Sequence, residues 1–340
     1  REIRNLTKEE VDEFYFGNVK PGQSVENIPL DSLPFVQNKI IQSEHLKTDA
    51  FVLGEGEFGV VHKGQFNGEI VAIKSSKSVA DIEYFKAFLK EIKVMAFVSE
   101  HKNIIKFFGA VVDKIRERVC SAVIELSPFG DLQKYLRTNS KIYTHDNNEV
   151  LSANSNVVGQ PGIQLNYNIL VSFCRQIAEG MEFLATKQVL HGDLATRNVL
   201  VFNDNIVKIT DFGLSRKLYN CANYVKTQQT PLPWRWMAPE SLRYFDFSTK
   251  SDVWSYGVTM WEIFSLAQVP FAGINWTTDF ADNLEAGYRL TKPQHCTQLE
   301  YEWMLKCWGK NPEDRPTFND CKRRMTPDVS ETNQNIETTF

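Results

Sequence analysis

Short runs of hydrophobic residues in the first 130 positions predict β-strands. Three runs of β-branched and aromatic residues lie between residues 51 and 74, and an Asn-Gly pair at 67–68 separates two of them, which is a strong hairpin signal. Two further runs, at 104–112 and 118–126, follow a stretch at about 81–99 whose apolar residues recur every three or four positions. The pattern therefore predicts a sheet and one amphipathic helix.

After Pro128 the pattern becomes mainly helical. A polar stretch at 138–168, which contains seven asparagines, is expected to be a flexible insert, and residues 327–340 a disordered tail. In residues 1–45 we expect a linker with one short helix at 8–16. A strand-rich part followed by a helix-rich part indicates the α+β class with two lobes. Its helices are expected at 131–137, 169–187 and 248–266.

Composition changes this picture little. The 340 residues carry a net charge of −4, so no general binding of nucleic acid is expected. Six cysteines form no CxxC pair, which favours reduced thiols. No apolar run approaches the roughly 18 residues that a membrane helix needs, and the chain begins at Arg1. We therefore expect a soluble fragment of a longer protein.

A glycine-rich segment is the first candidate for chemistry. Leu53, Gly54, Gly56, Gly59 and Val61 fit the pattern G-x-G-x-x-G-x-V and its leading apolar residue. Glycines let a backbone approach phosphate oxygens and present N–H groups to them. Dinucleotide-binding folds place a similar pattern between a strand and a helix, whereas strand-like sequence continues on both sides here. The context favours a hairpin over a nucleotide, and a glycine-rich hairpin without function is the alternative.

A lysine closes the third apolar run. Lys74 is costly to bury there unless it points at a specific partner. Glu91 lies seventeen residues further on in the predicted helix and is the candidate partner, while Glu83 and Glu100 are competing acids nearer the helix ends. Lys74 would hold the α- and β-phosphates of ATP, and Glu91 would fix its position. A surface lysine and a solvated glutamate are the alternative interpretation.

Two later segments carry oxygen ligands. Residues 189–201 have apolar flanks around a polar centre, where Asp193 is the candidate to accept a hydroxyl proton. Asn198 and Asp211, the latter in Asp-Phe-Gly after a strand-like run, supply the oxygens that Mg²⁺ prefers. Each fragment alone could arise by chance, but the four segments occur together and in this order.

Together these segments resemble the protein-kinase signature, with His191–Asn198 as H-R-D-L-x-x-x-N, Asp211–Gly213 as D-F-G and Ala238–Glu240 as A-P-E. The resemblance covers about residues 45–326. It implies an α+β, bilobal protein-kinase fold that has a five-stranded antiparallel N-lobe sheet with one helix, called αC in that family, and a mainly helical C-lobe. It also implies ATP with Mg²⁺, or alternatively Mn²⁺. The implied parts are a kinase domain at 46–326, with an N-lobe at 46–126, a hinge at 125–130, a C-lobe at 130–326 and a kinase insert at about 138–168.

The resemblance also implies roles for single residues. Ile124 would be the gatekeeper before the hinge, and Asp252 and Arg315 would be structural anchors, with Arg315 pairing with Glu240 in a buried ion pair. The implied catalytic set is Asp193, Lys74, Glu91 and Arg197. The implied ATP-binding set is Leu53, Gly54, Gly56, Gly59, Val61, Ala72, Lys74, Glu125 and Ser127.

One position departs from the family pattern. Where the family has the arginine of H-R-D, this chain has Gly192, which cannot pair with the phosphate of a modified activation loop. Control by activation-loop phosphorylation is therefore left open. Because the acid–base and metal residues are present, we expect activity, and a pseudokinase scaffold is the alternative.

The region around the catalytic aspartate resembles tyrosine kinases. Ala195 stands where serine/threonine kinases have a lysine, Arg197 would be the substrate-side cation, and residues 231–240 are similar to the peptide platform of tyrosine kinases. Dual-specificity kinases are the competing class. The implied substrates are proteins with tyrosine.

Finer similarity is to the platelet-derived and vascular endothelial growth factor receptor group, some invertebrate members of which also carry H-G-D. It rests on residues 88–110 and on an activation loop with Tyr219 and Tyr224, the candidate autophosphorylation sites. It implies the cytoplasmic face of the plasma membrane, a single-pass receptor, a homodimer formed through an extracellular part, and SH2- or PTB-type readers of phosphotyrosine. A non-receptor tyrosine kinase is the alternative.

Residues 1–45 resemble the juxtamembrane segment of these receptors, with Phe35 in place of the tyrosine of an L-P-Y motif. We expect this segment to dock onto the N-lobe as an inhibitory element, in which case its deletion raises basal activity.

Overall fold

The computed structural model describes residues 5–17, 34–55, 59–76, 82–144, 165–212 and 232–326. They divide into two compact units. The first unit draws on Arg1–Pro128 and Ile209–Gln228, and the second on Phe129–Lys208 and Gln229–Phe340. Several predicted features fall outside the described residues: Gly56, Gly213, Tyr219, Tyr224, most of the polar insert and the tail at 327–340.

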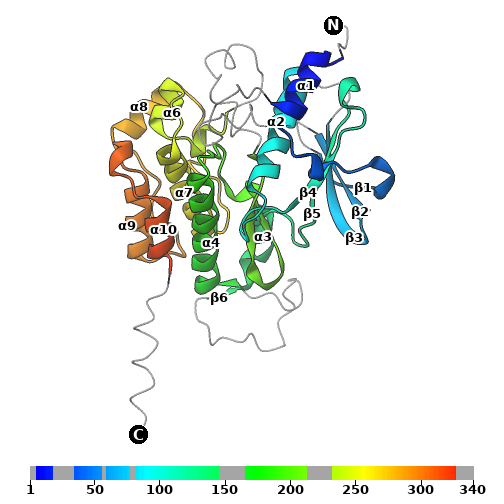
Figure 1. The fold of residues 1–340 in the computed structure, drawn as a ribbon. Helices are drawn as coiled ribbons and strands as arrows, with labels where there is room; N and C mark the ends of the chain where they lie inside the picture. The colour runs from blue at the N-terminus through cyan, green and yellow to red at the C-terminus, as the bar shows by residue number, and fades with distance from the viewer. Residues whose placement is uncertain are drawn as a thin grey trace, which may run out of the picture. The chain divides into compact units, whose positions relative to one another are not determined.

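A five-stranded antiparallel sheet forms the framework of the first unit (Figure 1). The Asn-Gly turn joins the second and third strands as predicted, with Phe66 paired to Glu69 and with positive φ angles of 49° at Asn67 and 83° at Gly68. In the order β1-β2-β3-β5-β4, its strands are β1 (Leu46–Glu55), β2 (Gly59–Phe66), β3 (Glu69–Ser76), β5 (Ser121–Glu125) and β4 (Phe107–Val111).

Helix α2 (Ile82–Val98) lies beside this sheet and contacts β4. Its apolar stripe is buried as its spacing predicts, with Phe85, Phe88 and Ile92 at 3% exposure or less. Two charged side chains, Glu91 and Lys93, are also buried on this helix. Because buried charges need partners, α2 must hold polar contacts on more than one side.

The N-terminal residues are more ordered than the predicted linker. Helix α1 (Lys8–Phe16) begins with a capping box, in which the Glu10 N–H donates to Thr7 Oγ1 and the Thr7 N–H donates to Glu10 Oε2. Residues 34–45 contain two 3₁₀ turns, Gln37–Lys39 and Ser43–His45, and the Ile41 N–H donates to the Ala110 carbonyl of β4. Residues 34–45 therefore cover the edge strand β4, and this protects the strand from pairing with another chain.

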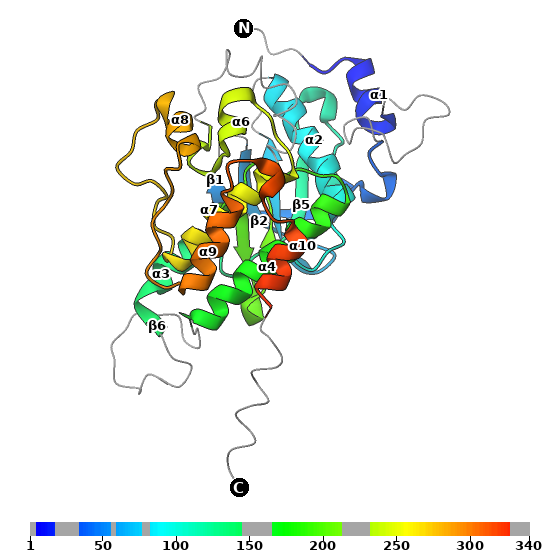
Figure 2. The same ribbon diagram turned by 90° about the vertical axis from the view of Figure 1, so that its left-hand side faces the viewer.

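The second unit is mainly helical, as predicted. Helix α7 (Thr249–Phe264) is buried from residue 251 to 264, and α9 (Gln298–Cys307) and α4 (Tyr167–Thr186) pack on it, with α10 (Phe318–Arg324) beside α4 (Figure 2). The other helices are α3 (Leu132–Asn139), α6 (Pro239–Tyr244) and α8 (Asp279–Glu285). Short strands pair as β6 (Tyr143–Thr144) with β7 (Leu165–Asn166) and β8 (Val199–Val201) with β9 (Val207–Ile209).

The α+β class and the five-stranded antiparallel sheet are confirmed. Five cysteines are described, and all five are buried free thiols. None of the helices in the described ranges is long and apolar enough to span a bilayer.

Candidate active site

Lys74, Glu91 and Asp211 form one cluster in the first unit. Strand β3 pairs Lys74 with Val61 of β2 and Ala122 of β5, which places the lysine inside the sheet. Its Nζ lies 2.6 Å from Glu91 Oε1 and 3.6 Å from Asp211 Oδ1. The structure thus brings together the pair predicted from spacing and adds the aspartate of Asp-Phe-Gly.

The competing acids have other surroundings. Glu83 lies near the start of α2 and pairs with Lys86 at 3.5 Å, with 71% of its side chain exposed, and Glu100 follows the end of the helix. Glu91 instead is 4% exposed. A buried carboxylate in contact with an ammonium group is the arrangement that fixes the lysine in place.

Electrostatics keep Lys74 charged. Burial lowers its pKa, but the neighbouring carboxylates of Asp211 and Glu91 outweigh this, so the pKa of Lys74 is raised overall. A lysine that stays cationic near neutral pH is suited to holding phosphate oxygens.

The backbone at Asp211 is unusual. Its φ angle of 63° lies in the left-handed region, which non-glycine residues seldom adopt, although aspartate tolerates it better than most. The next residue, Phe212, is buried at 1% exposure, while the Asp211 side chain is 42% exposed. Burial of Phe212 thus holds a strained turn that presents the carboxylate, which is typical of functional positions.

In the predicted nucleotide-binding hairpin, the structure explains why residue 59 is a glycine. A Cβ at Gly59 would lie 2.2 Å from the Ser75 carbonyl oxygen, so the close pairing of β2 with β3 requires glycine there. Gly54 pairs with Val61 across the hairpin, and Leu53 is 40% exposed. These residues form the described part of the predicted phosphate loop.

The predicted adenine-binding residues lie on neighbouring strands. Ala72 of β3 is paired with Ile124 of β5, and both are buried. Glu125 ends β5, and its Oε1 accepts a hydrogen bond from the Lys106 N–H at 2.7 Å. Ser127 lies two residues beyond. A buried, apolar Ala72–Ile124 pair next to a strand end is suited to an adenine ring.

Asp193, Arg197 and Asn198 form a second cluster, in the second unit. Residues 196–198 make a single 3₁₀ turn, which folds Arg197 and Asn198 back toward Asp193. Arg197 forms an ion pair with Asp193 Oδ1, and the Asn198 amide donates to Asp193 Oδ2 at 2.9 Å and to its carbonyl at 2.7 Å. Since its NH₂ group is used in this way, Asn198 presents its amide oxygen as the atom that could bind Mg²⁺.

Asp252 of α7 fixes the backbone just before Asp193. Its two carboxylate oxygens accept hydrogen bonds from the N–H groups of His191 and Gly192, both at 2.9 Å. Burial raises the pKa of Asp252 to about 6, against the lowering effect of these two bonds. The predicted anchor role of Asp252 is therefore explained by direct contacts with the loop.

The departure at Gly192 also has a backbone reason. Its φ is 75°, in the region that only glycine adopts without cost. We expect Gly192→Ala to lower the free energy of unfolding by about 1 kcal/mol and Gly192→Asn by less, because asparagine tolerates this region. Urea unfolding of the three proteins measures the difference. An alanine variant as stable as the wild type would contradict the assignment of strain.

Sequence reasoning missed Glu262 as a functional candidate. Although fully buried on α7, its carboxylate accepts hydrogen bonds from the Thr196 N–H at 3.0 Å, the Thr196 hydroxyl at 2.8 Å and Trp236 Nε1 at 2.9 Å. Burial raises its pKa. Glu262 therefore joins the 3₁₀ turn at 196–198 to the segment at 232–240. A glutamate that interrupts an apolar helical run was the available signal.

The predicted ion pair between Arg315 and Glu240 is present in the second unit. Arg315 Nη1 and Nη2 lie 2.6 and 2.9 Å from the two carboxylate oxygens, and the arginine side chain is fully buried. This is a bidentate contact, the strongest geometry for such a pair.

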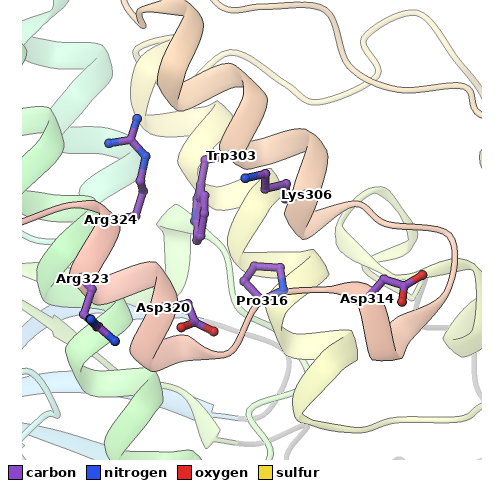
Figure 3. A pocket seen from close by; sticks show the side chains of 7 residues that line it. All are labelled: Trp303, Lys306, Asp314, Pro316, Asp320, Arg323 and Arg324. Carbon is purple, nitrogen blue, oxygen red and sulfur yellow. The ribbon is translucent and has the colours of Figure 1, made fainter.

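A separate hollow of the second unit contains none of the predicted site residues. Figure 3 shows the side chains that line it, among them Trp303 and Lys306 of α9 and Asp320, Arg323 and Arg324 of α10. Asp320 is engaged by Thr317 at the start of α10. Both positively and negatively charged side chains line this hollow, so its charge does not favour an anion such as a nucleotide.

The match to a known family decides the identity. Residues 48–325 match the sequence profile described as protein tyrosine and serine/threonine kinase. The chain belongs to this kinase family. Within the kinase domain, the Lys74–Glu91 pair and the Asp193 turn occupy the motifs from which the family was predicted, so that prediction is confirmed.

Three curated relatives that this kinase domain matches are named as receptors. Vascular endothelial growth factor receptor 1 of Gallus gallus is 32% identical over 88% of the chain and 27% of the receptor. Tyrosine-protein kinase receptor torso of Bombyx mori is 36% identical over 81% of the chain and 37% of that protein. Fibroblast growth factor receptor 1 of Xenopus laevis is 38% identical over 78% of the chain and 33% of the receptor. The kinase domain thus spans about a quarter to two fifths of the relatives it matches.

Proposed function

We propose that this chain is an ATP-dependent protein tyrosine kinase that transfers the γ-phosphoryl group to tyrosine hydroxyls. The carrying observation is that both chemical sets are intact: Lys74 is held by Glu91 at 2.6 Å in the first unit, and Asp193 is held by Asn198 at 2.9 Å in the second. A pseudokinase scaffold would not need to keep either geometry.

Each residue has a distinct role in this proposal. Lys74 binds the α- and β-phosphates, and Glu91 positions Lys74. Asp193 orients the tyrosine hydroxyl and accepts its proton, and Arg197 orients Asp193 from the substrate side. Asp211 in the first unit and Asn198 in the second would each offer an oxygen ligand to Mg²⁺, which would neutralise phosphate charge, and Mn²⁺ has the same ligand preference. The nucleotide-binding role extends to Leu53, Gly54, Gly56, Gly59, Val61, Ala72, Glu125 and Ser127.

The wider setting is also part of the proposal. Because the relatives are named as receptors, we propose that the chain is the catalytic part of a single-pass receptor at the cytoplasmic face of the plasma membrane, which dimerises through another part of the protein. Tyr219 and Tyr224 would be autophosphorylation sites that SH2- or PTB-type modules bind.

Phosphoamino-acid analysis tests the reaction. Purified chain is incubated with labelled ATP, Mg²⁺ and a Glu/Tyr copolymer or casein, with Lys74→Met as the inactive control. Phosphotyrosine that depends on Lys74 supports the proposal. Phosphoserine alone would refute the substrate class, and equal signal from both proteins would favour a scaffold.

The N-terminal segment bears on activity through α2. Lys93 of α2 donates to the Glu13 carbonyl at 3.0 Å and lies 5.4 Å from the centre of the Phe14 ring. Lys86 pairs with Glu10 at 2.9 Å, and Phe14 stacks on the buried Phe35 at 4.9 Å. Helix α1 thus holds the helix that carries Glu91 while the Lys74–Glu91 pair is closed.

This geometry supports an activating effect of the N-terminal segment, whereas the sequence led us to expect an inhibitory one. We expect deletion of residues 1–17 to lower kcat/KM for a peptide roughly three- to tenfold. The reason is that α2 loses contacts that favour the closed Lys74–Glu91 pair, and a loss of about 1 kcal/mol is enough to change the balance between closed and open forms by a factor of this size. A kinetic assay beside Glu9→Gln, an exposed α1 residue, measures it. Raised activity after deletion would restore the inhibitory interpretation.

A further inference from the structure

Tyr244 is the most exposed tyrosine in the ranges that the structure describes, at 71%. Tyr288 follows at 46%, and its ring contacts that of Phe271 at 5.7 Å. The hydroxyl of Tyr301 is already engaged, because it donates to the Leu290 carbonyl at 2.9 Å. A tyrosine that accepts a phosphoryl group must enter the site of an enzyme, and among these three Tyr244 has the fewest contacts to give up.

The backbone around Tyr244 is held by few bonds. Tyr244 is the last residue of α6, a helix of six residues, and the next residue, Phe245, has a strained φ of 54°. Ser241 closes this end of the helix: its carbonyl accepts from the Phe245 N–H at 3.2 Å, and its hydroxyl donates to the Asp246 carbonyl at 2.6 Å. Opening this end breaks few bonds and relaxes a strained residue, so the segment can extend at low cost.

The residue before Tyr244 ties α6 to α8. Arg243 forms an ion pair with Asp282, and its Nε lies 3.1 Å from Glu285 Oε1. Both acids belong to α8, which lies beside α6 (Figures 1 and 2). A single arginine therefore balances two carboxylates of α8 at this contact, and a new negative charge nearby would disturb the balance.

The start of α6 is fixed much more firmly than its end. Glu240, in the first turn, pairs at 2.6 and 2.9 Å with Arg315, whose side chain is fully buried. This pair keeps the first turn of α6 in the core while the last turn opens. Tyr244 then extends into solvent, where a second molecule can reach it.

We propose that Tyr244 is a phosphorylation site modified by a second copy of this chain, and that the phosphate weakens the contact between α6 and α8. The proposal rests on the proposed function. The Tyr244 oxygen forms a bond to the γ-phosphorus of ATP on the second copy, the bond from this phosphorus to the β–γ bridging oxygen breaks, and ADP leaves. The phenol proton passes to the Asp193 carboxylate of the second copy.

The effect on α8 follows from charge. A phosphate on Tyr244 adds about two negative charges at the C-terminal end of α6, where the helix dipole favours cations. It attracts Arg243 and repels the carboxylates of Asp282 and Glu285, and both interactions weaken the contact with α8. Because the groups involved are partly exposed, salt screens the effect and confines it to this part of the unit.

Site-resolved mass spectrometry tests the modification. Isotope-labelled chain with Asp193→Asn, which serves only as the acceptor, is incubated with wild-type chain, ATP and Mg²⁺. We expect Tyr244 of the labelled chain to be phosphorylated at least about tenfold faster than Tyr288, because it opens at lower cost. The unlabelled chain with Tyr244→Phe should keep its kcat for the Glu/Tyr copolymer within about twofold, since Tyr244 touches none of the proposed catalytic groups.

The outcomes separate this proposal from the proposed function. If the copolymer is phosphorylated and Tyr244 of the labelled chain is not, or is no faster than Tyr288, the assignment of the site is overturned. If neither the copolymer nor any tyrosine of the labelled chain is phosphorylated, the proposed function fails, and modification by a second copy fails with it.

Hydrogen exchange tests the effect of the phosphate without any turnover. Phosphotyrosine is incorporated at position 244 during synthesis of the whole chain. We expect the amides of α8 to exchange about three- to tenfold faster than in the unmodified chain at low salt, and this ratio to fall at high salt. The amides of α9 should not change. In Arg243→Met the unmodified chain should already exchange faster at α8, and the phosphate should add little. Unchanged exchange at α8, or an equal increase at α9, would overturn the proposed action on the α6–α8 contact.

Discussion

Replacing Asp193 with asparagine is expected to lower kcat for tyrosine phosphorylation by about 10²- to 10⁴-fold, the range that a positioned general base contributes. The substitution keeps the size of the side chain and the amide contact from Asn198, but it removes the negative charge that Arg197 pairs with and the group that accepts the hydroxyl proton. KM for ATP should change by less than about threefold, because Lys74 and Asp211, the proposed phosphate and metal contacts, are untouched, as is Glu91, which positions Lys74.

Steady-state kinetics with a tyrosine peptide measure both constants. Asp204→Asn is the matched control, since Asp204 is exposed in a 3₁₀ turn of the same unit, and it should leave kcat within twofold of the wild type. A variant at Asp193 that retains a tenth or more of the wild-type kcat would show that another group accepts the proton. A large rise in KM for ATP with unchanged kcat would instead assign Asp193 to nucleotide binding.

Several features of this kinase domain could be predicted from the sequence because their signals are local. The hairpin turn at 67–68 depends on two residues that tolerate positive φ. The partner of Lys74 was predicted from a spacing, and the amphipathic stripe of α2 places Glu91 near the strand that carries the lysine. Local periodicity and short-range chemistry were enough in both cases.

Other features depend on contacts that no local pattern records. Glu262 receives its hydrogen bonds from residues 66 and 26 positions earlier, Thr196 and Trp236. Lys93 of α2 reaches a carbonyl of α1 that lies 80 positions away. From local sequence alone, a polar residue on a helix is predicted to be exposed to solvent, because the pattern does not show which distant segment packs against it. Tertiary packing therefore decides these roles, and the N-terminal segment was read as a linker for the same reason.

Tertiary packing also sets the strength of the ion pair between Arg315 and Glu240, which the family resemblance did predict. Arg315→Met is expected to lower the free energy of unfolding by about 3–5 kcal/mol, the cost of leaving a buried charge without its partner. Besides Glu240, Arg315 donates to the carbonyls of Gly309 at 2.8 Å and Lys250 at 3.0 Å. Methionine fills similar space but satisfies none of these acceptors, so their desolvation is no longer compensated.

Urea unfolding followed by circular dichroism measures this loss, and a companion variant assigns its cause. Arg315→Met combined with Glu240→Gln should recover part of the stability, because the unpaired carboxylate is then gone. The control is Arg243→Met, which breaks a half-exposed pair with Asp282 and Glu285 and should cost no more than about 1 kcal/mol. If the single variants Arg315→Met and Arg243→Met lose equal stability, burial does not set the strength of the pair. If the double variant is no more stable than Arg315→Met alone, the loss does not come from the stranded charge. It then comes from the two carbonyls left without a donor and from packing around Trp254, whose ring centre lies 5.1 Å from the Arg315 guanidinium.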